Sequence, residues 1–186
     1  MNEAERSEWI KGLAQFDVDN ELAIMAVFCA FMLPRNMLDV GCGTGAVVNT
    51  AQTLGVDAFG VDQLAKDSST FKEVDLTQKL DLKRKFELVY CVEVVEHLQP
   101  EYEGVICDTL ARHTAPNGIL VFTAALPGQN GYNHFNCQPK QYWRDRLESR
   151  GMRFNDAYTF RMATIWQHTH MTLNHLALNV QVFNQL

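Results

Sequence analysis

The sequence predicts an α/β fold in which helices cover both faces of a doubly wound, mostly parallel sheet. Short, mostly apolar segments recur along the chain between helical patterns, which is typical of parallel strands that are buried on both faces. A glycine-rich turn joins the first of these segments to a helix. Hydrophobic residues make up 47% and charged residues 20% of the 186 residues, an ordinary balance for one globular domain.

The residue ranges of the helices and strands follow from hydrophobic periodicity, turn residues and helix caps. The N-terminal region, 1–34, predicts a weakly amphipathic helix over 3–16 and an apolar helix at about 21–33, with Asp19 or Asn20 as its N-cap and an uncharged stretch over 22–33. The uncharged stretch is too short for a membrane span, which needs ~20 residues, so we expect it in the core. In the central core, 35–125, we expect strands at about 37–40, 57–62, 71–75, 86–92 and 119–123, and helices at about 46–54 and 101–114. A further helix is expected at about 138–150.

The C-terminal region, 126–186, does not continue this alternation of strands and helices. A polar loop precedes the helix at about 138–150, and no Asp, Glu, Lys or Arg occurs from Met162 to the end. Apolar and polar residues alternate over 178–182, which predicts a half-buried strand. We expect a hairpin that closes one edge of the sheet and that could pair with a second copy of the chain.

Charge and cysteine content exclude several classes of protein. Sixteen basic and twenty-two acidic residues give a net charge of −6, the wrong sign for a domain that coats nucleic acid. The five cysteines contain no C-x-x-C pair and indicate neither a disulfide framework nor a cysteine-rich zinc site. The N-terminus is acidic, whereas a signal peptide begins with basic residues. We therefore expect a cytoplasmic protein with no membrane partner.

The glycine turn indicates a ligand site. Gly41, Gly43 and Gly45 follow a strand and open a helix, so the backbone can approach a ligand and direct helix N–H groups toward it. Asp62 ends the next strand, where its carboxylate can accept ribose hydroxyls. With Ala46 the run also fits the dinucleotide pattern, so glycine spacing alone leaves a nicotinamide cofactor open.

An ordered set of motifs over about 36–125 resembles the class I S-adenosylmethionine-dependent methyltransferases. The matching runs are Leu38-Asp39-Val40-Gly41-Cys42-Gly43-Thr44-Gly45, Gly60-Val61-Asp62, Val74-Asp75-Leu76 and Phe86 to Leu98. An acid two positions before the first glycine, here Asp39, is typical of this family and not of nicotinamide dehydrogenases. The resemblance implies a Rossmann-like, mostly parallel seven-stranded sheet with an antiparallel terminal strand. The short connections after Asp62 and Asp75 suggest that the helices usual there are reduced to turns.

The same resemblance implies that 35–125 is a cofactor-binding core that binds S-adenosylmethionine, and it assigns the residues around this cofactor. These are Asp39 at the ammonium group, Gly41, Cys42, Gly43 and Gly45 beneath the methionine and ribose, Asp62 and Gln63 at the ribose and adenine edge, Asp75 and Leu76 at the adenine, and Cys91, Val92 and Glu93 along the methionine.

An acid–histidine run follows the strand at 86–92, where ligands bind in open α/β sheets. In a helical turn, Glu93, Glu96 and His97 can face one point and could hold a divalent cation. The run resembles that of small-RNA 2′-O-methyltransferases and ubiquinone-pathway O-methyltransferases, and His134 lies where the former carry a further histidine. The alternative is that this run binds no metal. In that case the acid orients the cofactor and the histidine caps a loop. His97 or His134, helped by Glu96, is our candidate for removing an acceptor proton.

Little chain remains for recognising a methyl acceptor, which favours an O or N nucleophile of a small molecule. Two residue sets could contact it or could simply pack and be solvated: the aromatic residues Tyr132, Phe135, Tyr142 and Trp143, and the basic residues Lys140, Arg144, Arg146 and Arg150. Two alternatives stay open: a metal-assisted RNA 2′-O-methyltransferase, and a non-catalytic cofactor-binding regulator or partner subunit that pairs through the C-terminal hairpin.

Overall fold

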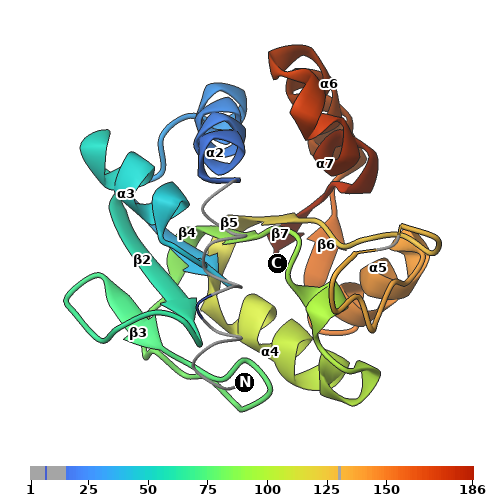
Figure 1. The fold of residues 1–186 in the computed structure, drawn as a ribbon, viewed down its shortest axis with the longest axis horizontal. Helices are drawn as coiled ribbons and strands as arrows, with labels where there is room; N and C mark the ends of the chain where they lie inside the picture. Colours follow the sequence, from blue (N-terminus) through green and yellow to red (C-terminus); the bar gives the residue numbers. More distant parts are fainter. Residues whose placement is uncertain (1–6, 8–15, 130) are drawn as a thin grey trace.

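The computed structural model describes residues 7, 16–129 and 131–186 (Figure 1). Its centre is a seven-stranded sheet with the order β3-β2-β1-β4-β5-β7-β6. The pairs from β3 across to β5 are parallel, and β7 runs antiparallel between β5 and β6. The predicted fold class, the seven strands and the antiparallel last strand are confirmed.

Most predicted elements before residue 150 are present with shifted ends. The strands are β1 (Asn36–Val40), β2 (Asp57–Asp62), β3 (Phe71–Glu73), β4 (Phe86–Cys91), β5 (Thr114–Phe122), β6 (Met152–Phe154) and β7 (Gln181–Gln185). The helices are α2 (Asp17–Phe31), α3 (Ala46–Thr53), α4 (Glu103–His113), α5 (Lys140–Glu148), α6 (Asp156–Thr169) and α7 (Asn174–Asn179), with 3-10 turns η1 (Val95–His97), η2 (Pro100–Tyr102) and η3 (Met171–Leu173). Residues 63–70 and 74–85, all described, contain no helix, as their short length suggested.

Helices cover both faces of the sheet. Figure 1 shows α2, α3, α6 and α7 on one side and α4 on the other, with α5 beside β6. Successive strand residues alternate between two apolar layers: Tyr90 and Val121 pack under α2, α6 and α7, whereas Val89 and Leu120 pack against α4 and α5. This double burial explains why the strands read as nearly continuous apolar runs.

The helix α2 begins at Asp17, before the predicted start near residue 21, and no side chain caps it. Asp19, predicted as a cap, lies in the first turn and accepts a hydrogen bond from the Thr172 hydroxyl at 2.6 Å. Asp17 likewise accepts one from the Thr44 hydroxyl at 2.6 Å. These carboxylates therefore bind neighbouring elements. The helix predicted over 3–16 lies outside the described residues.

The uncharged stretch of α2 is a core segment, as expected. Ala23, Ile24 and Val27 are buried, and the Trp166 indole of α6 donates a hydrogen bond to the Ala23 carbonyl at 3.0 Å. In the described part of the chain, no helix combines the length and apolar character that a membrane crossing requires.

The predicted C-terminal hairpin is wrong. The helices α6, η3 and α7 occupy most of 156–179, and only the last strand, β7, is extended. From residue 162 onward no Asp, Glu, Lys or Arg marks the exposed side of these helices, and Met171 and Leu178 are exposed, so the usual signal of a helical period is missing. The strand β7 lies between β5 and the unpredicted β6, so both of its edges are paired. Pairing with a second copy through this hairpin therefore loses its structural basis.

Candidate active site

The glycine turn joins β1 to α3 at the carboxyl edge of the sheet. Gly41, Gly43 and Gly45 have φ angles of 82°, 52° and 88°, in the left-handed region that favours glycine. The Gly41 N–H donates to the Val61 carbonyl of β2 at 2.8 Å. A Cβ on Gly41 would lie only 2.5 Å from Cγ2 of Val94. The turn is thus fixed against β2 and against the loop after β4.

Two carboxylates flank this turn. Asp62 accepts hydrogen bonds from the backbone N–H groups of Gly43, at 3.0 Å, and Leu64, at 2.8 Å. Asp39, at the end of β1, is 3% exposed. Burial, together with the charge of Asp62, raises the pKa of Asp39 to about 8. A cationic group at this position would reverse that shift and ionise Asp39.

The other predicted cofactor residues lie along the same edge, because the parallel strands β1, β2, β3 and β4 all end there. Gln63 is exposed just after β2, and Asp75 accepts hydrogen bonds from the backbone N–H and hydroxyl of Thr77 at 2.9 and 2.6 Å. The rest of this set are Cys42 in the glycine turn, Leu76 after β3, Cys91 at the end of β4, and Val92 and Glu93 beyond it.

Glu96, His97 and His134 form a compact cluster, in which one ligand atom of each lies within 4.8 Å of the others. The turn η1 supplies the first two, and the loop after β5 supplies His134. The two imidazole centroids are 4.9 Å apart, edge to face. The Nδ1 atoms of His97 and His134 bind the carbonyls of Asn133, at 3.3 Å, and Gln129, at 3.0 Å. Such backbone bonds orient a histidine to present Nε2 to a metal or substrate.

Glu96 is the buried acid of this cluster. Its Oε1 accepts a hydrogen bond from the Ala125 N–H at 3.1 Å, whereas Oε2 has no hydrogen-bond partner among the described residues. Burial and the nearby Glu93 raise the pKa of Glu96 to about 8. Burial and the neighbouring His134 lower the pKa of His97. At neutral pH the cluster therefore combines a mostly protonated acid with a neutral imidazole, and a bound cation would ionise the acid.

Glu93 does not share the helical turn that the sequence predicts. Only Val95–His97 are helical, and Glu93 has a left-handed φ of 54°. Its carboxylate accepts a hydrogen bond from the side-chain amide of Asn179 at 3.2 Å. The structure gathers Glu96, His97 and His134 in one cluster, and the Glu93 carboxylate interacts with Glu96 from outside the helical turn. The predicted helical spacing is wrong, and the four-residue cation site with Glu93 stays a prediction.

Several buried polar residues of this region were not predicted. Asn179, at the end of α7, and Asn136, in the loop after β5, are each 1% exposed. Within the described chain, Asn179 Oδ1, Asn136 Nδ2 and the Tyr90 hydroxyl have no hydrogen-bond partner. Asn179 lies in the alternation that we interpreted as a strand, where a polar residue is expected to face solvent. The signal that could have revealed it is an asparagine next to an apolar run.

The aromatic candidates divide into packing and exposed residues. Trp143 is fully buried and contacts Tyr142 edge to face, with ring centroids 5.2 Å apart. Tyr132 and Phe135 are 68% and 50% exposed. Tyr132 and Phe135 are thus the exposed members of this set, and Tyr142 is half-buried.

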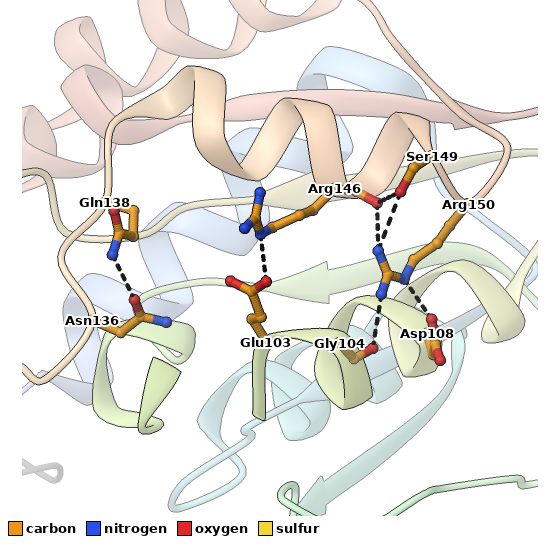
Figure 2. Close-up of polar contacts among 8 residues, drawn as sticks. All are labelled: Glu103, Gly104, Asp108, Asn136, Gln138, Arg146, Ser149 and Arg150. Atoms are coloured by element: carbon orange, nitrogen blue, oxygen red, sulfur yellow. Dashed lines mark hydrogen bonds and ion pairs between the residues drawn. The ribbon is translucent and has the colours of Figure 1, made fainter. Parts of the chain in front are cut away.

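The basic residues on and just after α5 are engaged within the protein. Figure 2 shows Arg146 paired with Glu103 and Arg150 paired with Asp108. The Arg144 guanidinium lies 3.4 Å above the centre of an aromatic ring, and Lys140 donates to a backbone carbonyl at 3.3 Å. The predicted basic face is thus largely used for packing between α5, α4 and the sheet.

A cavity of about 350 Å³ lies at the opposite, amino edge of the sheet. Its lining includes Phe31 at the end of α2, Leu88 of β4 and Ile119 of β5. The carboxyl-edge residues described above do not contribute to it, so this cavity is separate from the candidate active site.

Comparison with known proteins agrees with the fold. Residues 8–175 match a family described as "Methyltransferase domain". The chain belongs to this methyltransferase family. The Ubiquinone biosynthesis O-methyltransferase of Rickettsia typhi is 28% identical to this methyltransferase over 110 residues, which are 52% of the chain and 43% of that relative. The matched part therefore spans less than half of that curated protein.

Two solved structures share the fold of this methyltransferase. The Burkholderia thailandensis 1,6-didemethyltoxoflavin-N1-methyltransferase has a TM-score of 0.68 at 13% identity, covering 96% of this chain and 84% of its own. A TehB-like SAM-dependent methyltransferase from Corynebacterium glutamicum has a TM-score of 0.67 at 14% identity, with complete coverage of both chains. At this identity the likeness concerns the fold alone.

Proposed function

We propose that this methyltransferase transfers the methyl group of S-adenosylmethionine to an oxygen or nitrogen atom of a small molecule. The observation that carries the proposal is the arrangement of Asp39, the left-handed glycine turn and Asp62 at one sheet edge. The Burkholderia thailandensis neighbour, solved with S-adenosylhomocysteine and a small acceptor, supports the same choice. When bound, the cofactor supplies an activated methyl group, so the protein mainly aligns the reactants and handles the acceptor proton.

We assign the cofactor contacts as the resemblance suggests. Asp39 pairs with the ammonium group, because a cation favours its ionised form. The glycine turn, with Cys42, runs beneath the methionine and ribose, and Asp62 accepts the ribose hydroxyls. The remaining contacts are Gln63, Asp75 and Leu76 toward the adenine, and Cys91, Val92 and Glu93 along the methionine.

We assign acceptor proton handling to the acid–histidine cluster. His97 has a lowered pKa, so it is neutral near pH 7 and can accept a proton from an acceptor hydroxyl. His134 lies against it, and Glu96 is held beside both by the Ala125 N–H. Glu96 and His134 therefore orient and assist His97 in this proposal.

A divalent cation fits the same cluster. The unpartnered Oε2 of Glu96 and two imidazoles oriented through Nδ1 provide an oxygen and two nitrogen ligands. When bound there, a cation would polarise an acceptor oxygen. The proposed ligands are Glu96, His97 and His134.

We favour a small acceptor over RNA and over a non-catalytic role. An RNA substrate calls for a basic surface, whereas the net charge is −6 and Arg146 and Arg150 are paired with Glu103 and Asp108. The non-catalytic alternative relied on a C-terminal hairpin that is not formed. We further propose that residues 1–186 act as one domain in the cytoplasm, since the five cysteines are free thiols.

Calorimetric titration with S-adenosylhomocysteine and with NAD tests the proposed function. We expect the homocysteine compound to bind and NAD not to bind. Asp62→Ala should weaken binding at least about tenfold, because charge-assisted hydrogen bonds to the ribose are lost. Asp57→Ala, at the other end of β2, is the matched control and should leave affinity unchanged. Binding of NAD alone, or an unaltered affinity in Asp62→Ala, would refute the proposal.

A further inference from the structure

The helix α2 is apolar on all sides, although one of its sides faces solvent. Residues 22–33 contain no charged or amide side chain, and the inner side of the helix packs into the core through Ala23, Ile24 and Val27. A helix on the surface of a globular protein normally carries polar residues on its outer side, whereas a helix that is apolar all round is buried. The composition of α2 therefore indicates that a further element covers its outer side.

The exposed side of α2 has the spacing of a helix–helix interface. Four apolar residues lie along one line of the helix, at intervals of four, three and four residues: Val18, Leu22, Met25 and Cys29. Val18 and Met25 are 66% and 40% exposed, Cys29 is exposed and Leu22 is half-buried. We call this line the outer stripe. Alternating intervals of three and four residues are those with which paired helices interlock, and an uncharged stripe can be buried without a desolvation penalty for charge.

The helix α6 runs antiparallel beside α2. The rings of Tyr158 and Phe31, near the end of α2, lie 5.0 Å apart between centroids, whereas the Trp166 indole donates to a carbonyl in the first half of α2. Arg161 is exposed between these two contacts, so it flanks the C-terminal half of α2. Glu21 is exposed near the N-terminal end. A base therefore borders one end of the outer stripe and an acid borders the other.

We propose that two copies of the chain pair through their outer stripes, with the two α2 helices antiparallel. In this arrangement Val18 of each copy meets Cys29 of the other. Glu21 of each copy approaches Arg161 of the other, so the charges that border the stripes are complementary. The net charge of −6 opposes contact between two copies over most of their surface, which leaves the uncharged stripe as the favourable place to meet. Such a two-fold contact uses the same surface on both copies, as closed dimers do.

Sedimentation velocity of the full chain tests this pairing. The unsubstituted protein should form a dimer of twice 21.1 kDa that dissociates on dilution. Met25→Glu should raise the dissociation constant of the dimer at least about 100-fold, because each copy then buries a carboxylate without a partner. Leu54→Glu is the matched control, since Leu54, just after α3, is 39% exposed. It should change the constant less than about twofold, and far-UV circular dichroism should show both variants folded.

A disulfide between the copies tests the antiparallel register. Within one chain, positions 18 and 29 lie about 16 Å apart along α2, too far for a disulfide, so a bond between them joins two copies. The thiol introduced by Val18→Cys should therefore form a covalent dimer with Cys29 when copper phenanthroline is the oxidant. Adding Cys29→Ser should abolish that product. Glu21→Arg should weaken the dimer several-fold, and adding Arg161→Glu should restore it.

Any one of four results would overturn the inference. The first is a chain that stays monomeric at the highest micromolar concentrations. The second is equal weakening of the dimer by Met25→Glu and Leu54→Glu. The third is a covalent dimer that persists after Cys29→Ser is added, and the fourth is no recovery of affinity in the double charge reversal.

Discussion

Gly41→Ala is expected to destabilise the protein by about 2–5 kcal/mol and to abolish S-adenosylhomocysteine binding. The left-handed φ of 82° costs about 1–2 kcal/mol for a residue with a Cβ. The new Cβ would also lie 2.5 Å from Cγ2 of Val94, and overpacking of this kind costs about 1–3 kcal/mol. Urea unfolding and calorimetric titration measure the two effects.

Gly55→Ala is the matched control for Gly41→Ala. Gly55 has the same φ of 82°, but no atom lies within 4 Å of the Cβ position. It should therefore show only the backbone cost of about 1–2 kcal/mol and should bind ligand normally. Adding Val94→Ala to Gly41→Ala should recover part of the lost stability. Equal destabilisation by the two glycine substitutions would show that contact with Val94 does not constrain the turn.

Asp39→Asn is expected to weaken S-adenosylhomocysteine binding about 100-fold or more, because the ligand ammonium group loses a buried ionic partner. The pKa of Asp39, about 8, adds a pH dependence. Only the ionised acid attracts the ammonium group, so affinity of the unsubstituted protein should rise as pH approaches 8. In Asp39→Asn this rise should be absent. An affinity unchanged by the substitution would remove Asp39 from the cofactor site.

The same substitution should alter the pH dependence of folding stability. The pKa of Asp39 is raised in the folded protein, so its contribution to stability is present at low pH and is lost as pH rises through about 8. The slope is at most about 1.4 kcal/mol per pH unit for one group. Asp39→Asn should therefore reduce the loss of stability between about pH 5 and pH 8. Glu96 retains a contribution of the same sign. Thermal unfolding of the ligand-free proteins measures this difference, and equal slopes would contradict it.

The glycine turn and the strands that end beside it could be predicted because their signals are local. The central strands β1 and β4 are mostly apolar runs, and glycine is the residue that most readily adopts the left-handed conformation of this turn. The conformation of Glu93 could not be predicted from such local signals. Its spacing from Glu96 and His97 favours one helical face. In the structure, however, Glu93 has a left-handed conformation and forms hydrogen bonds with Thr123 and Asn179. No local pattern around a glutamate encodes that conformation.

The C-terminal helices were missed for a related reason. A helical period is recognised by contrast between apolar and charged positions, and the segment from Met162 onward contains no charge other than that of histidine. Buried Trp166 and Leu173 contact residues distant in sequence, so tertiary packing decides the structure there. Asn179 could not be assigned to the site for the same reason, since its partner is 86 residues away.

Hydrogen–deuterium exchange with and without S-adenosylhomocysteine tests the central claim that the carboxyl edge of the sheet holds the cofactor. We predict slower exchange in peptides covering 39–45, 60–64 and 91–97, where the glycine turn, Asp62 and the acid–histidine run lie. Peptides covering 31–34 and 116–119, which line the cavity at the amino edge, should exchange at unchanged rates. Protection confined to those two peptides, or no protection at saturating ligand, would contradict the account.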